Sequence, residues 1–210
     1  MKYKKRTDAV LFLHNRIYKT KLFRNEVCIM SEILENLVKE DGDFSEAKFK
    51  AKVDNVFIQL YTAVMKQDLQ KVKHFLSEEV YEKYNEKIKQ LQLANRIQVY
   101  DELNVSNTNI TNINELEDRF EINVSMLVKY LDYRITKDTK KYISGDRDVR
   151  VEKIVNLKFS KIKNAKALGN ARKCTGCGAN IDLNKNGVCE YCGSVFLLEQ
   201  YDWILEEVHD

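Results

Sequence analysis

The sequence predicts an α+β fold: helices packed on an antiparallel sheet, with a small cysteine-rich module inserted before the last strand. Two observations predict the layers. Apolar side chains recur with a helical period up to about residue 95, and from there the period changes to two. A third observation predicts the module, because two closely spaced pairs of cysteines interrupt the last strand-like segments.

Three helical segments are expected in the first half of the chain. In residues 44–66 the apolar positions follow i, i+4, i+7, i+8 and i+11, and Asp43 is the expected N-cap. The pattern breaks at "KQDL", a short second helix follows, and Ser77 is the expected N-cap of a third. The expected apolar positions are Phe49, Val53, Val56, Phe57, Leu60, Val64, Leu69, Val72, Phe75, Leu76, Val80, Tyr81, Tyr84, Ile88 and Leu91.

Four strands are expected after residue 95. The first lies within residues 99–113, where a polar stretch predicts a bulge. Gly145 and Asp146 are expected in the turn between the second and third strands. Alternation along the second, third and fourth strands predicts one buried face. Its expected members are Phe120, Ile122, Val124, Met126, Val128, Tyr130, Val149, Val151, Val155, Leu157, Phe159, Tyr201, Trp203 and Leu205.

Four of the five cysteines form two CxxC pairs, in "CTGCG" and "CEYCG". The glycine after each pair permits the positive φ of a tight turn, so two turns can aim four thiolates at one ion. That closed tetrahedral set is typical of structural zinc. The expected zinc ligands are Cys174, Cys177, Cys189 and Cys192, in a ribbon over residues 170–195.

Two other roles for these thiols remain open. An iron–sulfur cluster also takes four cysteines, although the even spacing and the turn residues "NKNG" favour a zinc ribbon. A redox dithiol is disfavoured because no βαβ pattern surrounds either pair. Cys28 stands alone, and we expect it to act as a small buried apolar residue.

Charge and hydropathy limit the classes of function. The net charge is only +3 and no cationic stripe with stacking aromatics is visible, so nucleic-acid binding is not expected. Residues 9–13 form the longest apolar run, which is too short to span a bilayer, and no secretion signal is seen. We therefore expect a cytoplasmic protein. Residues 1–42 form a basic segment expected to be helical, which would either contact anionic lipid peripherally or dock on the domain or a second copy.

Four stretches carry a resemblance to a known family: "FKAKVDNVFIQLYTAVMKQDLQKVKHFLSEEVYEKY", "VSMLVKYLDY", "GDRDVRVEKIVNLKFSK" and "YDWILEEV". They resemble the Tim-forty-four-like family, the C-terminal domain of the inner-membrane import-motor subunit of mitochondria. The resemblance spans residues 44–208 and implies a domain over 43–210 with the nuclear transport factor two-like cone, in which helices pack into a curved sheet. Bacterial members look similar, and some carry a ribbon like this one just before the last strand.

The resemblance implies a binding domain rather than an enzyme. We expect a scaffold that engages a protein partner or a membrane surface, with zinc as a structural clip and an oligomeric state that the sequence leaves open. The import-motor role is not carried over, because neither a membrane span nor a long chaperone-binding region is visible.

The alternative function is a small-ligand binder or an enzyme that uses the cavity of the curved sheet. The residues expected to line such a cavity are Asp101, Tyr130, Asp132, Tyr133 and Trp203. An enzyme would need an acid–base pair there, such as a histidine with an aspartate. None of the three histidines lies within an expected strand, and His74, on the short helix, is expected to face solvent.

Overall fold

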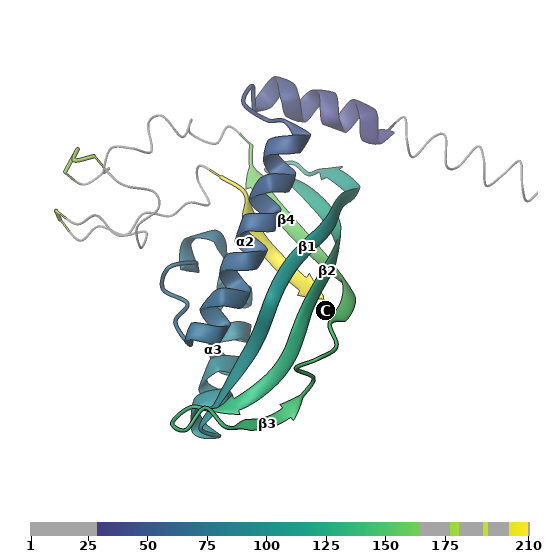
Figure 1. Ribbon diagram of the computed structural model, residues 1–210. Helices are drawn as coiled ribbons and strands as arrows, with labels where there is room; N and C mark the ends of the chain where they lie inside the picture. Colours follow the sequence, from purple (N-terminus) through teal and green to yellow (C-terminus); the bar gives the residue numbers. More distant parts are fainter. Residues whose placement is uncertain (1–28, 164–176, 181–190, 193–201, 210) are drawn as a thin grey trace, which may run out of the picture. The chain divides into compact units, whose positions relative to one another are not determined.

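The computed structural model describes residues 29–163, 177–180, 191–192 and 202–209. The chain divides into two units, Met1–Gly42 and Asp43–Asp210. In the first unit the described part contains a helix over residues 29–40. In the second unit, helices pack on an antiparallel sheet, which confirms the expected α+β architecture (Figure 1).

The long helix α2 spans Glu46–Lys66. Its N-cap is Ser45, whose side-chain oxygen accepts the N–H of Lys48, so the prediction of Asp43 as the cap is wrong. At the other end Gln67 adopts a left-handed conformation with φ of 56°, and its N–H bonds to carbonyls of the last turn. The expected apolar stripe is buried; it comprises Phe49, Val53, Val56, Phe57, Leu60 and Val64.

The short helix expected next is a single 3-10 turn, η1, over Lys73–Phe75. Its flanking residues Leu69, Val72 and Leu76 are nevertheless buried, as the spacing predicted. Helix α3 follows over Glu78–Leu93, and Ser77 caps it as predicted by accepting the N–H of Val80.

The sheet has five strands. They are β1 Arg96–Glu115, β2 Arg119–Thr136, β3 Tyr142–Gly145, β4 Val151–Ile162 and β5 Ile204–His209. The order is β1-β2-β4-β5 with antiparallel pairing, and β3 pairs with β2. The bulge expected in β1 is confirmed, because its register with β2 shifts at three places.

Strand β3 was not predicted, and it changes the position of Gly145. This glycine ends β3 instead of lying in the turn, with φ of +105°. A Cβ atom there would lie 2.3 Å from the carbonyl oxygen of Asp132, so β3 depends on the absence of a side chain at this position.

The core lies between α2 and one face of the sheet, along which α2 runs in Figure 1. The predicted face is confirmed for most of its members, whereas Val149 is 64% exposed because β4 begins only at Val151. Tyr201 lies outside the described residues. The confirmed buried members are Phe120, Ile122, Val124, Met126, Val128, Tyr130, Val155, Leu157, Phe159, Trp203 and Leu205.

Candidate functional site

The four paired cysteines lie between β4 and β5, which are neighbouring antiparallel strands with Ser160 opposite Ile204. The cysteine segment therefore occupies the place of a hairpin turn. Cys177 and Cys192 are exposed, and Gly178 has the positive φ expected after the first pair, +73°.

Two of the four predicted zinc ligands, Cys177 and Cys192, belong to the described residues. Cys174, Cys189 and Gly193 lie outside the described residues, as does Cys28. Within the described part of the chain, no group of three or more His, Cys, Asp or Glu side chains is arranged to hold a metal ion. The zinc ligands stay a prediction from the sequence.

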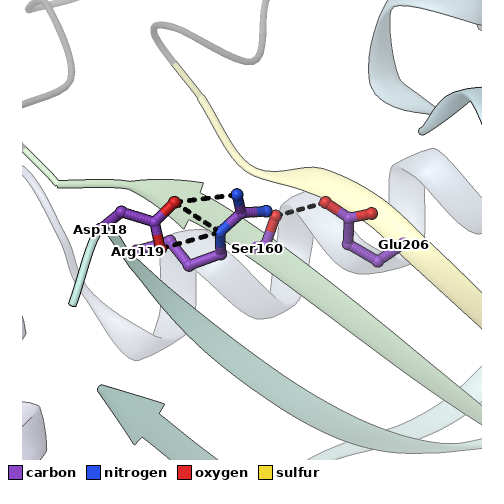
Figure 2. Close-up of polar contacts among 4 residues, drawn as sticks. All are labelled: Asp118, Arg119, Ser160 and Glu206. Atoms are coloured by element: carbon purple, nitrogen blue, oxygen red, sulfur yellow. Dashed lines mark hydrogen bonds and ion pairs between the residues drawn. The ribbon is translucent and has the colours of Figure 1, made fainter. Parts of the chain in front are cut away.

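At the end of β4, residues at the β1–β2 turn hold Lys163, the first residue after the strand. The Nζ atom of Lys163 lies 2.9 Å from a carboxylate oxygen of Glu115, and its backbone N–H donates to the carbonyl of Asp118 at 2.8 Å. Asp118 also accepts hydrogen bonds from the guanidinium of Arg119 (Figure 2). This guanidinium lowers the pKa of the Asp118 carboxyl.

Polar side chains also join β4 to β5 beside the insertion. The buried hydroxyl of Ser160 donates to a carboxylate oxygen of Glu206 at 2.5 Å (Figure 2). The charge of Glu206 contributes to the raised pKa of Arg119, whose main cause is Asp118. Lys158 and Glu207 form an ion pair on the same two strands. The two strands flanking the cysteine segment are thus linked by side chains as well as by backbone.

On the β5 side, the chain is held by helix α2. Lys52 of α2 forms an ion pair with Asp202, which lies two residues before β5 and 150 residues further along the chain. Both side chains are largely shielded, with 21% and 13% of their surface exposed. The backbone N–H of Ser77 also donates to the carbonyl of Leu205 at 3.0 Å, so the start of β5 is held from two elements.

His74 lies beside this ion pair, and the prediction that it faces solvent is wrong. Both of its ring nitrogens are buried without a hydrogen-bond partner in the described part of the chain. Its ring packs on that of Phe75, with centroids 4.1 Å apart. Burial and the charge of Lys52 lower the pKa of His74, and Asp202 opposes them in part. We call Lys52, His74, Phe75 and Asp202 the His74 cluster.

Two residues expected to line a cavity are instead packed in the core. Tyr130 is buried against Tyr61 and Tyr100, with ring centroids 6.0 and 5.4 Å away. Trp203 is buried against Phe49, with centroids 5.0 Å apart. Aromatic side chains therefore fill the parts of the sheet face around Tyr130 and Trp203, where the cavity was expected.

The three polar residues expected in the cavity lie near one end of β2. Asp132 accepts a hydrogen bond from the side chain of the buried Gln98 at 2.7 Å. Asp101 is exposed and accepts a long one, 3.4 Å, from the hydroxyl of Tyr133. The five expected cavity residues are thus divided between the packed core and this polar group.

Sequence reasoning missed the residues that hold the ends of the insertion. Lys52, Asp202 and Glu206 are charged residues in segments rich in charge, and no local pattern distinguishes them from solvent-facing neighbours. Ser160 carries a weak signal, because it is a small polar residue directly after the apolar alternation of β4.

The model of the Tim44-like domain matches residues 30–166, which is more than half of the chain and ends before the first cysteine pair. None of the curated proteins matches it. Domains of this family in general interact with proteins or membranes. None of the described helices is both long and apolar enough to cross a bilayer. The chain belongs to the Tim44-like family.

Proposed function

We propose that this protein is a non-enzymatic scaffold that engages a protein partner or a membrane surface, with one zinc ion as a structural clip in the segment between β4 and β5. The family supports the binding role, since its domains in general interact with proteins or membranes. No contact of the described residues favours the alternative of a ligand or substrate bound inside the sheet.

The observation that carries the proposal is the way the insertion joins the domain. One residue just beyond each strand is held by a side chain: Lys163, which follows β4, pairs with Glu115, and Asp202, which precedes β5, pairs with Lys52. A segment joined at two fixed points can present a surface without disturbing the core. Because a short segment with few apolar residues buries little surface, a metal ion is the expected source of its stability.

Zinc is expected at about one ion per chain, bound by the four thiolates. The double substitution Cys174→Ser and Cys177→Ser should abolish binding, because two thiolates do not complete the tetrahedron. The midpoint temperature of thermal unfolding of the domain should change little, since none of its described core residues belongs to the cysteine segment. Elemental analysis of protein purified without chelator measures the metal.

Cys28→Ser is the matched control, because it removes a thiol that is not part of a pair. It should retain the full metal content. Protein that carries no zinc, or carries iron with the visible absorption of a cluster, would contradict the zinc clip while leaving the binding role intact.

The membrane form of the proposal concerns the basic residues of the first unit. Each Lys or Arg near an anionic surface contributes about 1 kcal/mol, and inserted apolar side chains add to this. Vesicles rich in anionic lipid should therefore sediment the full chain at low salt and release it at high salt. A shortened chain beginning at Asp43, where the second unit begins, should not sediment.

No recovery of either chain would favour a protein partner over a membrane. Equal recovery of the full and shortened chains would contradict the role given to the basic segment and assign the lipid contact to the second unit. Neutral vesicles serve as the control, since they offer the same apolar layer without the surface charge.

A further inference from the structure

The His74 cluster joins three elements that are distant in sequence. Lys52 comes from α2, His74 and Phe75 from η1, and Asp202 from the residues just before β5. The Nζ atom of Lys52 lies 5.1 Å from the centre of the Phe75 ring and is also paired with Asp202. The cluster therefore contains one carboxylate, that of Asp202, beside the ammonium group of Lys52 and the imidazole of His74.

The imidazole is in an unfavourable position for taking up a proton. A buried polar group without a partner is unstable, and a charged one is more so. Lys52 is the cation that faces His74 from α2, and Asp202 is the anion that faces it from the segment before β5. On η1 itself, Lys73 directs its Nζ atom to the ring of Tyr81, 4.8 Å away. Among the described residues, Asp202 is therefore the carboxylate available to pair with a protonated His74. It already forms an ion pair with Lys52.

We propose that His74 makes the junction between α2, η1 and the start of β5 sensitive to pH: on protonation it competes with Lys52 for Asp202, and the junction loosens. This inference does not depend on the proposed binding role or on zinc, because all the residues that carry it belong to the domain itself. Its consequence for the cysteine segment is that one of the two ends of the insertion is held less firmly in acid.

The direction of the effect follows from the pKa of His74. In the closed junction this pKa lies below the ordinary value of 6.5, and in the opened junction it returns toward that value. Opening therefore takes up a proton between the two values. The contribution of neutral His74 to stability is complete above pH 6.5 and is lost as the pH falls from there to the folded-state pKa.

Hydrogen exchange of the full chain tests the proposal, with the rates corrected for the intrinsic pH dependence of exchange. One bound proton raises the opening equilibrium by at most about tenfold per pH unit. We expect a rise of about three- to eightfold between pH 7 and pH 5.5 in peptides covering residues 72–77 and 202–208. In His74→Phe, which keeps the ring but cannot bind a proton, the rise should disappear.

Three further measurements complete the test. His209→Gln is the control, because the imidazole of this exposed histidine pairs with Glu207 and is not part of the His74 cluster, and it should retain the wild-type rise. His74→Gln should also lose the rise. It provides a second variant without a titratable ring, so the test still stands if His74→Phe folds poorly. In Lys52→Met, the imidazole signal of His74 in NMR should titrate at a higher pH than in the wild type, because Asp202 then has no competing cation.

The proposal is overturned if His74→Phe keeps the wild-type pH dependence, or if the imidazole titrates at or above pH 6.5 in the wild type. An unchanged titration midpoint in Lys52→Met would also overturn it, because Lys52 would then not compete for Asp202.

Discussion

Replacing Phe159 with alanine is expected to lower the free energy of unfolding by about 3–5 kcal/mol. Phe159 lies in β4 and is fully buried, and its ring meets the edge of Phe49 from α2 at 5.8 Å between centroids. Removal of the ring forfeits its transfer from water and leaves a cavity between the helix and the sheet. Because both sides of this contact belong to regular elements, little relaxation can fill the cavity.

Ile154→Ala is the matched control for this prediction. It lies on the same strand, but its side chain is 63% exposed, so truncation should change stability by no more than about 0.5 kcal/mol. Urea denaturation of both variants measures the difference. A loss below about 1 kcal/mol for Phe159→Ala would show that the buried face of β4 is not where the structure places it.

The second large effect is expected for Gly145→Ala, which should cost roughly 2–3 kcal/mol. The added Cβ would lie 2.3 Å from the carbonyl oxygen of Asp132 and 2.5 Å from the Cα of Tyr133. Both are backbone atoms of β2, so no side-chain rotation can relieve the contact. The φ of +105° is a further penalty for any residue with a Cβ.

The expected damage is local as well as global. Because β3 pairs only with β2 in the described sheet, its amide protection should fall more than that of β4. Gly42→Ala is the control, since a Cβ there meets nothing within 4 Å and should leave stability nearly unchanged. Equal stability of Gly145→Ala and the wild type would mean that β3 is not held against β2 as described.

The parts of the fold that could be predicted are those in which burial repeats along one element. In β2, side chains from Phe120 to Tyr130 alternate without interruption, because one face of the strand is buried in the core and the other is partly exposed. The ends of elements were less predictable. Asp43 and Ser45 are both good N-caps, and only the position of the first helical turn decides between them. β3 is too short to show a period.

The side chains around the insertion could not be predicted for a different reason. His74 has Lys73 and Phe75 as its sequence neighbours, and these suggest a surface position on a short helix. Its environment is set by Lys52 and Asp202, which the fold brings together across 150 residues. The location of the cysteine segment between two strands was predictable because it needs only element order, whereas the contacts that hold its ends need tertiary structure.

The junction between β4 and β5 also defines where this fold can accept foreign sequence. Ser160 and Ile204 face each other across the two strands, so the ends of the insertion are already close together. Closing a longer loop between fixed ends costs only about 0.6 kcal/mol for each doubling of its length. A protein engineer could therefore replace residues 170–195 with another small module, such as an epitope or a peptide-binding hairpin, and use the domain as a carrier. Natural variants of the same architecture could diverge in specificity by the same route while their helices and sheet stay unchanged.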